Sequence, residues 1–402
     1  MKFLLIAQDL RITGTSEGIV SRSFLAKLRI AYPDSIIDVV YLKNSFSEDD
    51  LHLLPVDSIQ THILNLKMPF FTKWLNKLYW RLLHVSLKDE YIHSVYASYI
   101  KKIDYKPYNH IFIRSSGLDH EVILATYNLP ILKKAIVNFH DPYPLPWYVG
   151  TQKLMSALDL FRVKKMAAIV AQVKTCSSSA HYMAHDLQYL YASKKKFYTL
   201  PHQFDASVFD LSDTKEVLLK TKKVTISYHG AIMFGRNVDI LLDAYKELVD
   251  NNILYQENTE FILRLKGQDN NRLRKKYASI KNIQVFDTLN FSNSSNEQIY
   301  ETDITIILEN GPIYCNILVG KAPFLAAYNK PVLTVSPPKS ELRNIIVDQK
   351  YLASMDNKEE IKFKLGQLIL DRMESDSLTN PFGEYFSDIN FKKSLDEILN
   401  AK

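Results

Sequence analysis

The clearest chemistry in the sequence lies in one stretch near its middle. Val224–Tyr228 has the composition of a buried strand, His229-Gly230 reads as its turn, and Val238–Val249 repeats apolar residues at helical spacing. A strand that turns through a glycine into a helix aims unpaired N–H groups and the positive end of the helix dipole at one point. Arg236 adds a cation there. The stretch predicts an anion site for the phosphates of a nucleotide, or an ordinary turn with a solvated arginine.

A second candidate loop follows the first apolar segment, Phe3–Ala7. Residues 8–18 form a polar loop in which Gly14 and Gly18 allow close approach of the backbone to a ligand. Hydroxyls and a carboxylate are offered by Thr15, Ser16 and Glu17. A helix carrying Phe24, Leu25 and Leu28 is expected after it. A ligand-binding loop and a plain surface loop both fit this pattern.

His140 is the third candidate. It follows Ala135–Phe139, a short apolar strand, and precedes Asp141-Pro142. An imidazole at the carboxyl end of a parallel strand lies where such sheets bind ligands. A structural histidine is the alternative.

The composition sets limits on these candidates. A chain of 402 residues, 47% of them hydrophobic, is large enough for two domains, and a net charge of +6 suits anionic ligands or a membrane surface as readily as nucleic acid. The two cysteines lack metal-ligand spacing, so we expect a reducing compartment and no structural zinc. The apolar start is too short for a secretory signal, and no run reaches the ~18 residues of a membrane span. We therefore expect a cytoplasmic protein.

Residues 61–110 hold eight basic and three acidic residues, and so carry most of the net charge. Within them, an apolar helical stripe is flanked by cations at four-residue spacing. The stripe is Phe71, Trp74, Leu75, Leu78 and Leu82, and the cations are Lys73, Lys77 and Arg81. Such a helix can lie on an anionic membrane surface through residues 70–88, on the inner face of the plasma membrane. A helix packed on a core with solvated lysines is the alternative, and nucleic-acid binding is not expected.

These residues must be positioned by alternating strands and helices. Further strands are expected at Ile36–Tyr41, Ile59–Leu64, His110–Arg114, Ala167–Gln172, Phe197–Leu200, Phe261–Leu265, Ile283–Phe286, Ile304–Leu308 and Pro331–Val335. Helices are expected after a cap at Ser177–Ser179 and over Ile317–Tyr328, Glu359–Leu370 and Phe391–Leu399. This alternation predicts an α/β protein of two doubly wound, Rossmann-like domains. We place them at 1–205 and 224–375, with a linker over 206–223 and a helical segment, 376–402, able to cross back to the first domain.

Four segments together resemble the GT-B glycosyltransferases, and more narrowly the retaining family 4 type. They are Arg236–Ala244, Lys321–Leu333, Leu200–Asp205 and Tyr300–Asp303. The second resembles the family pattern "K-x-P-E-Y-x-A-x-G-K-P-V-L" without a gap. The resemblance covers nearly the whole chain and implies a ligand cleft between the two domains.

The resemblance also implies roles for single residues. His140 would face the donor sugar, Arg236 would hold the donor diphosphate, and Glu17 would lie in the loop over the phosphates and acceptor, so these three are the catalytic candidates. The residues expected to bind the donor are Gly14, Thr15, Gly230, Arg236, Gly267, Thr288, Leu289, Gly311, Asn316, Ile317 and Lys321. Thr288-Leu289 would read the base, and the amides of 311–319 would meet the sugar and distal phosphate. No metal and no other cofactor is implied.

Three positions depart from the family pattern. Phe324 stands where the family has the glutamate that binds the donor ribose, Asn316 replaces an earlier glutamate, and Ala231 replaces a basic residue. Glu309 is a candidate to replace the ribose contact. We expect a glycosyltransferase that moves a sugar from a nucleoside diphosphate, UDP or GDP, to a glycan or lipid-linked acceptor in cell-surface polysaccharide biosynthesis. A nucleotide-sugar epimerase and a non-catalytic GT-B binding or scaffold protein are the alternatives.

Overall fold

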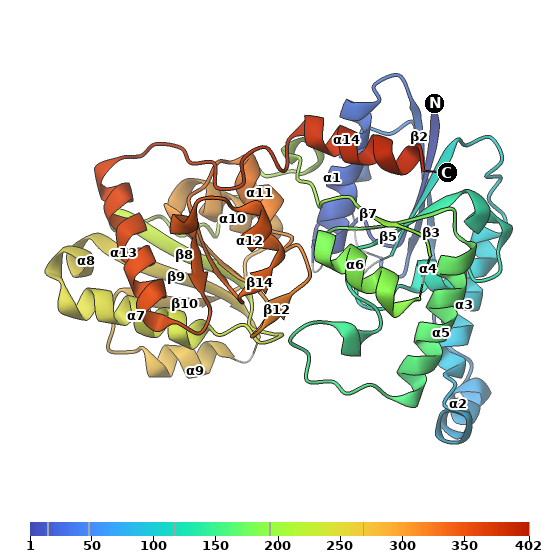
Figure 1. The fold of residues 1–402 in the computed structure, drawn as a ribbon, viewed down its shortest axis with the longest axis horizontal. Helices are drawn as coiled ribbons and strands as arrows, with labels where there is room; N and C mark the ends of the chain where they lie inside the picture. Colours follow the sequence, from blue (N-terminus) through green and yellow to red (C-terminus); the bar gives the residue numbers. More distant parts are fainter. Residues whose placement is uncertain (14–15, 47–48, 116, 193, 268, 402) are drawn as a thin grey trace. The chain divides into compact units, whose positions relative to one another are not determined.

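The computed structural model describes residues 1–13, 16–46, 49–115, 117–192, 194–267 and 269–401. These residues form two compact units. Unit 1 comprises Met1–Phe209 and Ser387–Lys402, and unit 2 comprises Asp210–Phe386. Each unit is built on one parallel sheet (Figure 1).

The sheet of unit 1 has seven strands in the order β3-β2-β1-β4-β5-β6-β7. The strands are β1 Lys2–Ala7, β2 Ile36–Lys43, β3 Ser58–Ile63, β4 His110–Arg114, β5 Ala135–Phe139, β6 Thr175–Ser178 and β7 Phe197–Thr199. All neighbours pair in parallel, with Phe3 opposite both Ile37 and His110. The central strands are buried along nearly their whole length, as expected for apolar strands covered on both faces.

Helices connect these strands. They are α1 Ser16–Ala31, α2 Phe70–Leu83, α3 Leu87–Ile100, α4 Glu121–Ala125, α5 Ala157–Gln172, α6 His181–Leu190 and α14 Asp388–Leu399. Short 3-10 turns occupy Leu51–Leu53, Pro130–Lys134, Leu145–Trp147 and Ala206–Val208. The last helix, α14, packs beside α1 (Figure 1). There the Tyr32 hydroxyl donates to Asp396.

Two predictions in this unit are wrong. The strand expected over Ala167–Gln172 is the last part of α5, and the strand itself follows at Thr175–Ser178, so Ser177–Ser179 caps no helix. A short apolar run does not distinguish a buried strand from a buried helix. The deciding signal lies upstream, where Ser156 and Asp159 form a reciprocal capping box that starts the helix.

The sheet of unit 2 has six parallel strands in the order β10-β9-β8-β11-β13-β15. They are β8 Val224–Ala231, β9 Thr259–Lys266, β10 Ile283–Asp287, β11 Ile304–Leu308, β13 Val332–Ser336 and β15 Leu352–Ser354, and a separate pair is formed by β12 Tyr314–Cys315 and β14 Lys339–Ser340. The helices are α7 Val238–Asn251, α8 Ile253–Asn258, α9 Asp269–Lys276, α10 Phe291–Asn296, α11 Ala322–Ala327, α12 Glu341–Ile345 and α13 Lys358–Glu374, with a π-helical turn at Glu297–Glu301 and a 3-10 turn at Gln349–Tyr351.

Two boundaries in this unit also differ from the prediction. His229-Gly230 is not a turn, because β8 continues through both residues to Ala231 in register with β9. The helix expected from Ile317 begins only at Ala322, after the two-residue strand β12. The predicted start of α7 is confirmed: Asn237 caps it by accepting from the N–H groups of Asp239 and Ile240.

The stretch expected to be a linker is held along α10 and the π-helical turn of unit 2. The N–H groups of Glu216, Leu218 and Lys220 donate to the side chains of Asn293, Glu297 and Glu301, respectively. Alternate residues of an extended chain lie roughly 6.6 Å apart, and four helical residues rise about 6 Å. The two spacings match closely enough for three successive hydrogen bonds.

Both sheets reverse their strand order at one point, between β1 and β4 in unit 1 and between β8 and β11 in unit 2. Right-handed crossovers on the two sides of such a point run to opposite faces of the sheet, so the loops separate there and leave a crevice at the carboxyl ends of the strands. The two switch points are therefore the places where each unit can bind a ligand.

A substitution at Gly18 tests the packing at the start of α1. A Cβ at this position would lie 2.0 Å from the backbone carbonyl oxygen of Arg11, so we expect Gly18→Ala to destabilise the protein by ~1–3 kcal/mol through overpacking. The measurement is the urea midpoint. Gly366→Ala is the matched control, because a Cβ there meets only side-chain atoms of Leu248 and Tyr255 at 3.3 Å. Equal midpoints for the two variants would contradict the packing argument.

Candidate functional site

Arg236 joins the two strands at the switch point of unit 2. Its Nε donates to Asn310 Oδ1, just beyond β11, at 3.1 Å, and its Nη1 donates to the Ala231 carbonyl at the end of β8 at 3.3 Å. The Tyr228 hydroxyl donates to the same carbonyl at 3.0 Å. The guanidinium is therefore held by neutral acceptors, and its positive charge stays available to a ligand.

Lys321 brings a second cation to this place. Its Nζ is buried, although other parts of the residue reach solvent, and it has no hydrogen-bond partner among the described residues. It lies 5.2 Å from the Tyr228 ring centroid, and a Cβ on Gly230 would lie 3.6 Å from it. Burial, with a smaller effect of Arg236, lowers the pKa of Lys321 to about 7. Two cations that bind no carboxylate in the described part of the chain can together attract an anion.

The loops around these cations are fixed by two glycines. Gly235 has a positive φ of 80°, and a Cβ there would lie 2.5 Å from the Gly311 carbonyl oxygen. The Gly311 N–H donates to the Phe234 carbonyl at 3.1 Å. Gly311 was predicted as a donor contact, and the structure places it where the loops after β8 and β11 touch.

The remaining predicted donor residues are divided between two places. Gly267, Thr288 and Leu289 directly follow β9 and β10, so they share the carboxyl edge of the sheet with Arg236. Asn316 and Ile317 are buried in the connection from β12 to α11. They do not begin a helix, so the expected helix amides are not present at 311–319.

Neither Phe324, at the family's ribose-binding position, nor Glu309, the candidate replacement, presents a carboxylate at the protein surface. Phe324 is buried on α11 with its ring centroid 5.3 Å from that of Tyr328. Glu309 is 0% exposed, and burial raises its pKa to about 7. A side chain sealed in this way does not reach a ribose, so the proposed replacement by Glu309 is not supported in this structure.

Unit 1 has its own basic cluster beside its switch point. Arg114 ends β4, His140 follows β5, and the Arg114 Nε donates to His140 Nε2 at 3.0 Å. The two residues are 3% and 5% exposed. Arg114 also lies 4.6 Å from the Phe24 ring centroid, and the His202 ring lies 5.5 Å from that of His140. Burial lowers the pKa of Arg114 to about 9, and burial together with this cation holds the pKa of His140 well below its ordinary value.

Glu17 reaches the same loop from α1. It lies in the first turn of the helix, not in a polar loop as predicted, and it is buried. Burial raises its pKa, while a hydrogen bond with Asp141, the residue after His140, opposes that effect. The Tyr148 hydroxyl donates to Asp141 at 3.0 Å. Gly14 and Thr15 lie outside the described residues.

The sequence analysis missed several residues at these two places. Arg114, Asp141, Tyr228 and Asn310 are all held at strand ends by the contacts above. Arg114 offered a signal, because a cation directly ends the apolar strand segment His110–Arg114. Nothing in the sequence indicated that it would meet His140, which is 26 residues away.

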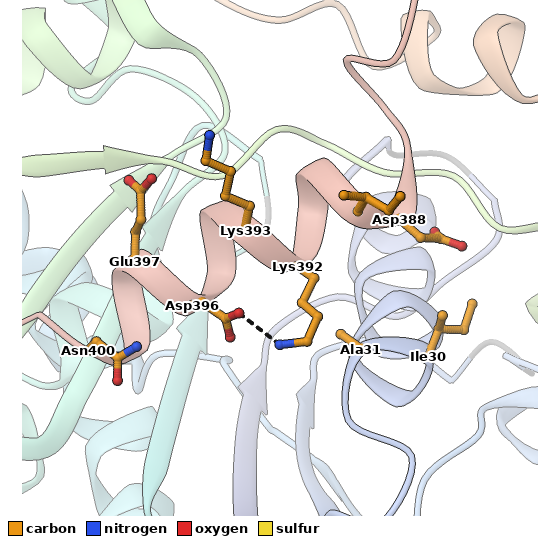
Figure 2. Close-up of a pocket in the computed structure, with 9 residues that line it drawn as sticks. Ile30, Ala31, Asp388, Lys392, Lys393, Asp396, Glu397 and Asn400 are labelled. Carbon is orange, nitrogen blue, oxygen red and sulfur yellow. Dashed lines mark hydrogen bonds and ion pairs between the residues drawn. The ribbon is translucent and has the colours of Figure 1, made fainter.

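The hollows in the described part of unit 1 include two large ones. The larger, about 770 Å³, runs along α14 and α1 and is lined by charged side chains such as Lys392 and Asp396, which pair with each other (Figure 2). It contains no predicted site residue. The smaller, about 190 Å³, is lined in part by Glu121, Tyr143 and Arg162. It touches the loop after His140, and Gln8 at the end of β1 donates to Glu121 at 3.0 Å.

Across the described ranges, no group of three or more His, Cys, Asp or Glu side chains is arranged to hold a metal ion. In the same part of the chain, none of the helices has both the length and the apolar character needed to span a bilayer.

Lys321 gives a test that needs no ligand. The pKa of Lys321 in the folded protein, about 7, lies below the ordinary ~10.4 of the unfolded chain. Between about pH 7 and 10 the unfolded chain therefore binds more protons, and the free energy of unfolding rises with pH. Below that range the buried ammonium lowers the free energy of unfolding by its full amount. We expect Lys321→Met to raise the melting temperature at pH 6.5, by ~2–4 °C for each kcal/mol gained, and by much less at pH 9.5. Lys222→Met is the control, because Lys222 is only partly buried and donates to the Glu257 carbonyl at 2.8 Å, so its replacement should not stabilise the protein. Destabilisation by both variants would contradict the assignment.

Comparison with known proteins identifies the fold. No protein-family model matches the chain, and no curated protein matches it by sequence. Among solved structures, HepE from Anabaena in complex with UDP and glucose is 11% identical with a TM-score of 0.61, and the match covers 100% of each chain. A TarM mutant from S. aureus, in complex with fondaparinux, α-GlcNAc-glycerol and UDP, is 10% identical with a TM-score of 0.61, covering 99% of each. UDP-GlcNAc 2-epimerase from Neisseria meningitidis is 13% identical with a TM-score of 0.57, covering 99% of each. The chain therefore has the GT-B fold of two Rossmann-like domains.

Proposed function

We propose that the protein is a retaining glycosyltransferase of the family 4 type. It would move a sugar from a nucleoside diphosphate to a hydroxyl of a glycan or lipid-linked acceptor in cell-surface polysaccharide biosynthesis. The observation that carries the proposal is the pair of cations at the unit 2 switch point, Arg236 and Lys321, held without a carboxylate.

The pair suits a departing diphosphate. A guanidinium presents a planar fork of donors to phosphate oxygens, and an ammonium adds a compact charge. Preorganised donors aimed at developing negative charge stabilise the transition state without reorganisation. A bound diphosphate would also supply the acceptor that Lys321 Nζ lacks and would restore its ordinary pKa.

The backbone after β9 and β10, at Gly267, Thr288 and Leu289, would meet the nucleobase. UDP and GDP remain the two candidates, and the UDP bound in the HepE and TarM structures supports testing UDP first.

Unit 1 would contribute His140 and Glu17 to the sugar and acceptor. The cavity of about 190 Å³ beside the loop after His140 is our candidate for part of the acceptor site. In a retaining reaction of this type the leaving phosphate can take the acceptor's proton, so no separate protein base is required.

An epimerase is the second candidate function. The fold match to UDP-GlcNAc 2-epimerase favours it, because that enzyme has the same architecture. An epimerase would convert the nucleotide sugar without any acceptor. A non-catalytic GT-B protein is a third possibility, motivated by Phe324 at the ribose-binding position. It would bind neither UDP nor GDP.

We also propose that α2 docks unit 1 on an anionic membrane surface. None of its residues is buried, and the rings and aliphatic side chains of its apolar stripe are open to solvent, with Phe71 80% and Leu82 68% exposed. The alternative of a core-packed helix is therefore wrong. Exposed apolar surface of this extent needs a cover, and Lys73, Lys77 and Arg81 fit anionic headgroups.

Arg236→Ala tests the donor site. We expect wild-type protein to show a raised melting temperature with UDP or GDP, and the variant to bind ~10–100-fold more weakly, because charged hydrogen bonds contribute ~1.5–3 kcal/mol. Arg272→Ala is the control, since Arg272 is exposed on α9 and pairs with Asp239 and Asp269. No shift with either nucleotide in the wild type would reject the transferase and the epimerase together.

Vesicle sedimentation tests the docking surface. We expect binding to phosphatidylserine vesicles at low salt, little binding to phosphatidylcholine, and release as salt screens the lysines. Phe71→Ser with Leu82→Ser should abolish sedimentation, whereas Leu219→Ser with Val347→Ser, two similarly exposed apolar residues of unit 2, should not. If both double variants sediment to the same extent, α2 is not the surface that binds the membrane.

A further inference from the structure

The contact between Arg114 and His140 determines where the imidazole carries its proton. A guanidinium has five N–H donors and no acceptor. Its Nε lies 3.0 Å from His140 Nε2, so Nε2 must be the atom that accepts. A neutral imidazole has a single ring proton, and that proton therefore lies on Nδ1.

The charge state of the ring follows from its surroundings. The titratable groups that act on it are Arg114 from β4, His202 from the segment after β7 and His120 from the start of α4. All three are bases, and no carboxylate is among them. Burial comes first, and these groups add to it, so the pKa of His140 stays well below 6.5. His140 is neutral at physiological pH, and its one lone pair is already occupied.

The opposite side of the ring is unoccupied. His140 Nδ1 is buried and has no hydrogen-bond partner among the described residues. A buried donor without an acceptor costs ~1–3 kcal/mol, and this one lies at the carboxyl end of β5, at the ligand-binding edge of the sheet. Arg114 likewise lacks a carboxylate and is held by His140 and the Phe24 ring.

We infer that Arg114 is a positioning residue that fixes the Nδ1–H tautomer of His140, so that His140 acts as a neutral hydrogen-bond donor to an oxygen of the substrate and not as a general base. The identity of that substrate rests on the proposed function, and the tautomer does not. The oxygen need only accept a hydrogen bond, as a hydroxyl of the transferred sugar does.

The tautomer can be measured without turnover. Protein labelled with 15N-histidine is studied by long-range 1H–15N correlation, and the His140 signals are assigned by their loss in His140→Gln. We expect the Nδ1–H pattern in wild type, with no titration between pH 5.5 and 8. An Nε2–H pattern, or a titration near pH 6.5, would overturn the inference.

Substitutions at Arg114 test the cause. In Arg114→Met the donor to Nε2 is lost, so we expect an Nε2–H population and a titration shifted toward pH 6.5. The signals of His229, which lies in unit 2 away from Arg114, serve as an internal reference. Arg114→Lys retains a cationic donor and should keep the wild-type pattern. Identical spectra in wild type and Arg114→Met would refute the role of Arg114. If Arg114→Met does not fold, the wild-type and Arg114→Lys spectra still test the inference, because an Nε2–H pattern in either one would overturn it.

Adding UDP-sugar separates the two proposals. The Nδ1–H proton signal should move downfield when a sugar oxygen accepts from it. If the wild type shows the Nδ1–H tautomer but its signal does not move with any nucleotide sugar, the tautomer assignment stands and the proposed transferase function is contradicted. With an active enzyme, kcat/KM should fall about tenfold in Arg114→Met, the loss expected for one hydrogen bond of ~1.4 kcal/mol, and should recover in Arg114→Lys.

Discussion

The placement of positive charge without counter-charge governs this structure. Arg236 and Lys321 in unit 2, and Arg114 in unit 1, are cations at the carboxyl edge of a parallel sheet that contact no carboxylate among the described residues. Removing such groups from water costs free energy, and without a paired charge or a ligand that cost is not offset locally. The rest of each unit must supply that stability, and the apolar strands of both sheets do so.

Other buried arginines show that the chain can compensate this charge where binding is not needed. Arg22 is fully buried, but it donates to the backbone carbonyls of Leu10, Asp49, Asp50 and Val208 and so ties four segments together. Arg264 forms two hydrogen bonds with Glu297, at 2.9 and 2.6 Å. Arg264 is thus paired with a carboxylate and Arg22 with several carbonyls, whereas Arg236 and Arg114 have fewer acceptors among the described residues, none of them charged.

The fold limits the reactions that this protein could catalyse but does not determine which of them occurs. Glycosyltransferases and a UDP-sugar epimerase share this architecture at about 10–13% identity, because a parallel sheet with a switch point can bind a nucleotide whatever reaction follows. The choice depends on which groups meet the sugar. A neutral His140 that donates through Nδ1 is suited to holding a sugar, and the acceptor then decides whether transfer occurs.

The sequence by itself determined the alternation of strands and helices, the two-sheet class and an apolar helical stripe from Phe71 to Leu82, and it marked Arg236 and His140 as site candidates. These follow from local periodicity and from the fact that parallel strands gather their carboxyl ends at one edge. Tertiary structure alone decided that β8 runs through Gly230, that Glu309 is sealed from solvent, and that Arg114 meets His140. Each of these depends on partners distant in sequence, because a hydrogen bond to a neighbouring strand or the burial of a side chain cannot be read from the residues on either side of it.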